Sequence, residues 1–189
     1  MNRPITESKP DPWRAPVTVA HIPDTGLHRE LEASPAERQA VAEFAGLREI
    51  PSLHASFDVV PKSGGRVHVT GNVRARVGQI CVVTLDPIES EIDEEIDLIF
   101  APEAEVRRLA DLIEEGRDDK EPPAIADPPE AIVNGIIDLG RLATDALFLA
   151  IDPYPRKPGA VFEAEVTAPD PEDNPFAALK ALQDKKKGQ

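Results

Sequence analysis

Hydrophobic and polar residues alternate along two consecutive stretches of the chain, between Arg66 and Phe100. Alternation with a period of two predicts antiparallel strands, each with one buried and one exposed face. A turn at Leu85-Asp86-Pro87 would make the two strands neighbours. The polar residues of the first strand are Arg66, His68, Thr70, Asn72, Arg74 and Arg76, and those of the second are Glu89, Glu91, Asp93, Glu95 and Asp97. The two polar faces are therefore predicted to carry opposite charge.

Further elements are predicted on the N-terminal side of this pair. Residues 16–22 and 53–60 indicate strands, and Lys62-Ser63-Gly64-Gly65 indicates the turn that completes a meander of three antiparallel strands. Ser34-Pro35-Ala36-Glu37 is typical of a capping box at the start of a helix, which Gly46 would end. We expect this helix to bury Val41 and Phe44, together with Ala40.

The helical period dominates after Pro102. One face of a first helix carries Val106, Leu109, Leu112 and Ile113, and Gly116 would end it. Residues 132–137 and 161–166 indicate short strands. The helix between them would bury Leu139, Leu142, Ala143, Ala146, Leu147 and Ala150.

These elements predict an α+β fold with a curved antiparallel sheet or a partly closed barrel, three to four packed helices and flexible termini. Gly71 and Gly78 would mark bends in the sheet. We expect a flexible segment at 1–14, a single domain at 15–166 with an acidic, proline-rich loop at 117–130, and a linker with a short helix and basic tail at 167–189.

The formal net charge of −14 argues against binding nucleic acid over the whole surface, because phosphate binding depends on Lys and Arg. A basic protein is the better electrostatic match. No stretch resembles a signal peptide or a membrane span, so we expect a cytoplasmic protein. Twenty prolines are about twice the average usage of ~5%, and many of them lie in the predicted ends and loop.

The sequence offers little catalytic chemistry. The four histidines lack the spacing of metal ligands, and no nucleophile elbow or phosphate-binding loop is present. The single cysteine, Cys81, lies among aliphatic residues and is expected to be a small core residue. We therefore expect no enzymatic activity, no cofactor and no metal.

Two interpretations of the cationic strand remain open. No acidic residue occurs between Val59 and Leu85, so Arg66, His68, Arg74 and Arg76 could offer donors to phosphate groups on a rigid platform. This face has no aromatic residue on which bases could stack. Alternatively, the cationic residues pair with the carboxylates of the next strand.

A second candidate site lies near the C-terminus. Asn174-Pro175 would start a short helix that carries Phe176, Leu179 and Leu182 on one side. An isolated helix of this length is marginal in water, which favours a partner that orders it. Fraying of the terminus is the alternative.

The order of several segments resembles one known family. These are GRVHVTGNVRARVGQ followed by Cys81, Leu85-Asp86-Pro87-Ile88, the acidic strand to Phe100, Ile137-Asp138-Leu139 with its helix, Asp152-Pro153-Tyr154-Pro155, and NPFAALKAL. Together they resemble the YceD family, the large ribosomal RNA subunit accumulation proteins, in an alphaproteobacterial form. Relatives often carry further cysteines near Cys81 and after the segment that corresponds to Asp152-Pro153-Tyr154-Pro155. Because this chain lacks them, any metal role in relatives does not carry over.

The resemblance implies a non-enzymatic ribosome-biogenesis factor that supports the synthesis, processing or stability of large-subunit ribosomal RNA. Its partner would be ribosomal RNA, a pre-ribosomal particle, or a basic ribosomal or assembly protein, with no membrane and no small-molecule substrate. The alternative function is an acidic adaptor that binds a basic protein without direct RNA contact.

Overall fold

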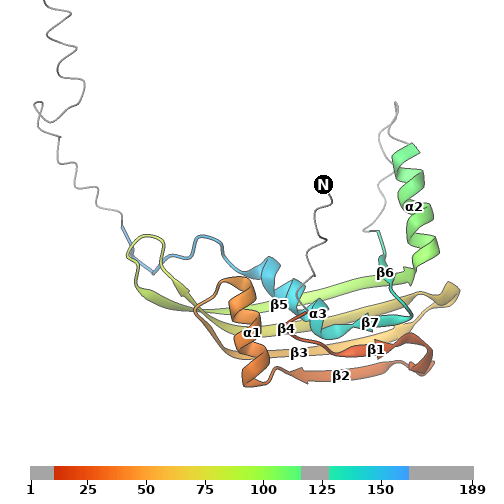
Figure 1. Cartoon of the computed structure of the whole chain (residues 1–189), viewed down its shortest axis with the longest axis horizontal. Coiled ribbons are helices and arrows are strands. Elements are labelled where there is room, and N and C mark those ends of the chain that lie inside the picture. Colours follow the sequence, from red (N-terminus) through yellow and green to blue (C-terminus); the bar gives the residue numbers. More distant parts are fainter. Residues whose placement is uncertain (1–10, 116–127, 162–189) are drawn as a thin grey trace, which may run out of the picture. The chain divides into compact units, whose positions relative to one another are not determined.

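One five-stranded sheet organises the first compact unit of the chain, which ends at Pro158. This computed structural model describes residues 11–115 and 128–161. The strands run over Leu27–Glu32 (β2), Glu49–Pro61 (β3), Val67–Ile80 (β4), Pro87–Pro102 (β5) and Glu130–Ile132 (β6). They lie side by side in the order β2-β3-β4-β5-β6 (Figure 1). The expected α+β class is confirmed.

The predicted pair of oppositely charged strands is also confirmed. β4 and β5 pair antiparallel from Val67 opposite Phe100 to Ile80 opposite Pro87, with no shift of register. β3 pairs with β4 in the same sense, with one irregularity between Glu49 and Ser52. The inner face of these strands supplies much of the core, with the buried residues Leu53, Ala55, Phe57, Val59, Val67, Val69, Val73, Ala75, Val77, Ile96 and Phe100.

The sheet is open, so the expectation of a partly closed barrel is wrong. Its outer strands, β2 and β6, do not pair with each other in the part of the chain that the structure describes. β6 pairs parallel with the last residues of β5, so the sheet is not wholly antiparallel. β2 was not predicted from the sequence. A single strand was predicted at 132–137, where the structure has β6, a turn, and β7 (Ile136–Asp138).

A second, two-stranded sheet lies over the main one (Figure 1). It pairs β1 (Pro16–Thr18) with β7. β1 is shorter than the strand predicted at 16–22, because the chain turns into a 3₁₀ helix, η1, over Val19–His21. Val17 and Ile137 from this pair are buried in the common core, as is Trp13 just before it.

Helix α1 (Pro35–Ala45) begins as predicted. Ser34 and Glu37 form the reciprocal capping box, and Gly46 ends the helix in the left-handed conformation. Val41 and Ala42 are buried, whereas Phe44 is 54% exposed, so the expectation that Phe44 lies in the core is wrong. Its ring stacks on Phe148 at a centroid distance of 5.3 Å.

The other two helices differ in how they are covered. α2 (Glu103–Glu115) continues directly from β5, and Leu112 on its predicted apolar face is exposed. α3 (Leu139–Ala150) packs on the sheet with Leu139, Ala143 and Leu147 buried, as predicted. Asp138 caps α3 by accepting from the backbone N–H groups of Gly140 and Arg141.

Several expected features lie outside the described residues. They are the predicted end of α2 at Gly116, most of the loop at 117–130, most of the strand at 161–166, and the C-terminal helix with Phe176, Leu179 and Leu182.

Gly71 stands where the ring of Phe57 crosses from the neighbouring strand. A Cβ atom at this position would lie 2.4 Å from the Ser56 carbonyl oxygen and 2.6 Å from Phe57 Cδ1. Gly78 is constrained in a similar way by the side chain of Glu49. Both glycines thus make room for a neighbour on β3.

We predict that Gly71→Ala lowers the free energy of unfolding by about 1–3 kcal/mol, because the added methyl group overpacks a rigid site. Chemical denaturation would measure this. Phe57→Leu should relieve part of the clash, so the double variant should lose less stability than the sum of the two single variants. Strict additivity would contradict the proposed contact.

Candidate partner-binding face

The outer face of the sheet, opposite the core, is polar over most of its length. Residues directly opposite each other on antiparallel strands share one face. The register therefore forms rows of outward-facing side chains across β2, β3, β4 and β5. The rows are His28-Asp58-Thr70-Asp97, Glu30-Ser56-Asn72-Glu95, Glu32-His54-Arg74-Asp93 and, without a β2 member, Ser52-Arg76-Glu91.

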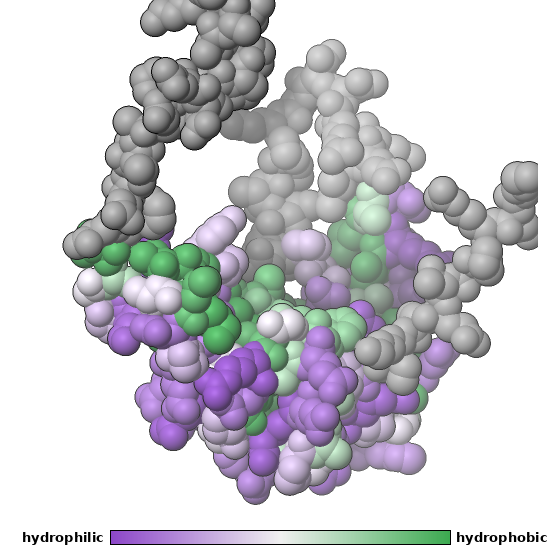
Figure 2. Space-filling view, turned by 60° about the vertical axis from the view of Figure 1, so that its left-hand side comes forward, coloured by the Kyte–Doolittle hydropathy of each residue, from purple (hydrophilic) through white to green (hydrophobic). Residues whose placement is uncertain are grey.

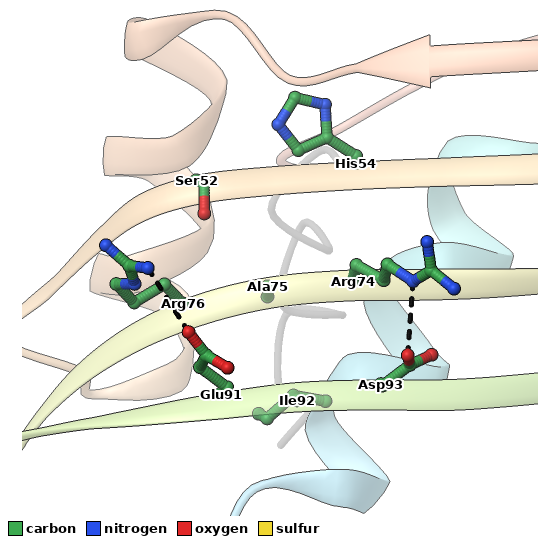
Figure 3. A pocket seen from close by; sticks show the side chains of 8 residues that line it. All are labelled: Ser52, His54, Arg74, Ala75, Arg76, Glu91, Ile92 and Asp93. Atoms are coloured by element: carbon green, nitrogen blue, oxygen red, sulfur yellow. Dashed lines mark hydrogen bonds and ion pairs between the residues drawn. The ribbon is translucent and has the colours of Figure 1, made fainter.

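Two arginines of β4 pair with carboxylates directly across the ladder (Figure 3). Arg74 Nε lies 3.1 Å from Asp93 Oδ2, and an amino group of Arg76 lies 3.2 Å from Glu91 Oε1. All four side chains are more than half exposed, so solvent screening leaves each pair with only a small contribution to stability.

The two other predicted cationic residues also have acidic partners. His68 Nε2 lies 2.6 Å from Asp97 Oδ1, one row away. Arg66 precedes β4 and forms an ion pair with Glu105 of α2. The structure thus brings His68, Arg74 and Arg76 onto one face and directs Arg66 to a helix. It shows the pairing across strands that was one of the two interpretations of the sequence.

Carboxylates outnumber arginines on this face. β4 supplies Arg74 and Arg76, whereas the neighbouring strands supply Glu30, Glu32, Asp58, Glu89, Glu91, Asp93, Glu95 and Asp97. The contribution of β2 was missed because β2 was not predicted. The alternation in LHRELE (27–32) was the available signal.

A shallow, open hollow lies on this face between the last two of these rows (Figure 3). Its volume is about 250 Å³, and its lining includes Ser52, His54, Arg74, Arg76, Glu91 and Asp93. His54 stands on β3 beside the two arginine–carboxylate pairs. Such a hollow can accept a protruding polar side chain of a partner, but it does not enclose a small molecule.

Local contacts shift two pKa values on this face. The amide of Asn72 and then the guanidinium of Arg74 stabilise the ionised form of Asp93, and they hold its pKa below the ordinary value. Hydrogen bonds from His28 to Asp58 and Glu30 raise the pKa of that histidine. The carboxylate-rich environment therefore favours cations.

Cys81 lies at the end of β4 and is fully buried. Its Sγ accepts the backbone N–H groups of Lys157, at 3.3 Å, and Thr84, at 3.4 Å. These bonds lower the pKa of the thiol to about 6. The cysteine is not part of the main hydrophobic core, and it instead joins the β4–β5 loop to the segment after α3.

Exposed apolar side chains gather around the same loop. Val82 donates its N–H to the carbonyl of Pro155 at 2.9 Å, which brings the β4–β5 loop beside the segment that follows α3. Ile80, Val82, Leu85 and Tyr154 are all exposed there. Figure 2 turns this end of the hairpin forward and shows hydrophobic residues gathered above hydrophilic ones.

Within 11–115 and 128–161, no three His, Cys, Asp or Glu residues come together in a way that would hold a metal ion. None of the helices described is both long and apolar enough to cross a membrane.

We predict that Asn72→Ala raises the pKa of Asp93 toward its ordinary value, because the amide donor that favours the carboxylate is removed. A lowered pKa stabilises the fold at pH values above the ordinary pKa. The stability advantage of the wild type over Asn72→Ala should therefore shrink as the pH falls through the folded-state pKa of Asp93. NMR titration of the carboxyl carbon would measure the shift. Thr70→Ala, on the same strand, should leave it unchanged, and an equal effect of both variants would contradict the assignment.

Comparison with known proteins gives one match. The model of the family described as large ribosomal RNA subunit accumulation protein YceD matches residues 69–183. No curated protein and no solved structure matches the chain. The family match includes nearly all of β4, the acidic strand β5 and helix α3. Because it spans more than half of the chain, the protein belongs to the YceD family of large ribosomal RNA subunit accumulation proteins.

Proposed function

We propose that this chain is a non-enzymatic ribosome-biogenesis factor that supports the synthesis, processing or stability of large-subunit ribosomal RNA. The family description supports a role in the accumulation of this RNA. One observation supports a role through binding: a broad polar face with well-exposed charged side chains, built on a continuous β-ladder. A rigid, open face of this kind suits contact with another macromolecule.

A specific observation favours a second function, that of an adaptor without direct RNA contact. The arginines that would bind phosphate already have carboxylate partners, and further carboxylates surround them. A phosphate backbone approaching this face would meet net negative charge, which opposes association. A basic ribosomal or assembly protein would meet a complementary surface.

Deletion of the gene should lower the ratio of mature large-subunit to small-subunit ribosomal RNA, and the wild-type gene supplied in trans should restore it. Quantitative RNA electrophoresis or sequencing of total RNA would measure the ratio. An unchanged ratio under all growth conditions would contradict the proposed function.

Direct RNA contact and action as an adaptor can be distinguished by a binding experiment. It uses purified protein and fragments of large-subunit ribosomal RNA at about 0.15 M salt. Action as an adaptor predicts no retained RNA. RNA binding that Arg74→Glu plus Arg76→Glu abolishes would instead favour direct contact. Arg107→Glu plus Arg108→Glu on α2 provides a control with the same change of charge.

A further inference from the structure

Strand β5 is paired along its whole length on one side only. β4 occupies that side from Pro87 to Phe100, whereas β6 pairs on the other side only with Phe100, Ala101 and Pro102. No other strand in the part of the chain that the structure describes pairs with β5. Among the residues that the structure describes, most of this long strand therefore presents an open edge of backbone donors and acceptors, which is a template for an additional strand.

The ladder identifies which residues face that open edge. At the end of the hairpin, the N–H of Cys81 donates to the carbonyl of Asp86 at 2.9 Å. In an antiparallel ladder, residues alternate between bonding to the neighbour and turning away from it. The register has no irregularity, so the backbone groups of the even-numbered residues of β5 bond to β4. The N–H and C=O groups of the odd-numbered residues are directed to the open edge, away from β4. The contact of the Asn72 amide with the carbonyl of Glu94, at 3.3 Å, agrees with this order.

The residues that offer free backbone groups are thus the acidic ones. Each has its carboxylate on the outer face and its N–H and C=O directed to the open edge. They are Glu89, Glu91, Asp93, Glu95 and Asp97. The side chains of Glu91 and Asp97 are 81% and 75% exposed, so the carboxylate row beside this edge is accessible.

This arrangement disfavours a second copy of β5 as the additional strand. Antiparallel pairing of two copies would place one acidic row directly beside the other, and like charges opposite each other destabilise a ladder. RNA is disfavoured by the same charges, because its phosphates would face carboxylates. A strand with a cationic side chain at every second position satisfies both the backbone groups and the acidic row.

We propose that the open edge of β5 between Glu89 and Asp97 binds an extended segment of a basic protein, which adds to the sheet as a further strand. Lys or Arg at alternate positions of that segment lie on the outer face beside the five carboxylates, and backbone hydrogen bonds fix the register. Glu89 and Glu95 form no ion pair with the residues that the structure describes, so their carboxylates can bind incoming cations. This inference rests on the proposed function and names the kind of partner through which it operates.

The opposite edge of the sheet is a poorer template. β2 is only six residues long, and its outward row contains His28 beside Glu30 and Glu32. This edge serves as the internal control for binding that depends on charge alone.

The test uses the full-length protein and the synthetic peptide Lys-Val-Lys-Val-Lys-Val-Lys-Val-Lys as a probe. We expect binding that slows hydrogen exchange at least tenfold at the amides of Glu89, Glu91, Asp93, Glu95 and Asp97, measured by NMR. The intervening amides already bond to β4 and should change little. Binding without protection of the odd-numbered amides would show attraction by charge alone and would overturn the proposal.

Two further forms of the peptide separate backbone pairing from charge. One is N-methylated on its lysines and the other on its inner valines, and both keep every positive charge. An added strand directs only one of these sets of amides to β5, so one methylated peptide should bind at least tenfold more weakly than the parent peptide. Equal binding of all three peptides would overturn the proposal.

Charge-reversed variants locate the site. Glu89→Lys plus Glu95→Lys should weaken binding of the unmethylated peptide at least tenfold, whereas Glu30→Lys plus Glu32→Lys on β2 should change it less than threefold. Equal loss in both variants overturns the proposal, as does self-association that protects the same amides without the peptide. These results are independent of the ribosomal RNA ratio, which tests the proposed function by itself.

Discussion

The uninterrupted register between β4 and β5 determines most of what this protein presents to its surroundings. Because the ladder has no bulge, every odd-numbered residue of β4 faces the core and every even-numbered one faces outward. One slipped residue would bury Arg74 and Arg76 and expose the valines. The same register sets which backbone groups of β5 bond to β4 and which remain at the edge. Core, charged face and open edge thus share one geometric cause.

The sequence predicted this part of the fold well because its signal is long and clear. Alternation over both strands, the turn at Leu85-Asp86-Pro87 and the capping box at Ser34 are local patterns that the tertiary structure preserves. The opposite charges of the two strands led correctly to one of the two interpretations, ion pairing across the ladder. The family resemblance was confirmed as well.

The remaining features depend on tertiary structure that a local pattern does not contain. β2 is short and mostly polar, so its alternation was weak, and only pairing with β3 makes it a strand. Phe44 lies on the apolar side of α1, but the sheet covers only the inner part of that side and leaves the ring against Phe148. An open sheet and a partly closed barrel require the same strands. They differ only in whether the outer strands meet, which the sequence does not encode locally.

These differences change which residues define the candidate site. The sequence drew attention to the cationic side chains of β4, because they are rare in an acidic chain. The structure places those side chains between two strands that supply carboxylates, so the surrounding field is negative. An exposed strand edge normally invites unwanted pairing, and charged side chains are a common protection against it. Here a single acidic row repels identical copies and nucleic acid while it attracts cationic strands. The feature that protects the edge also selects its partner.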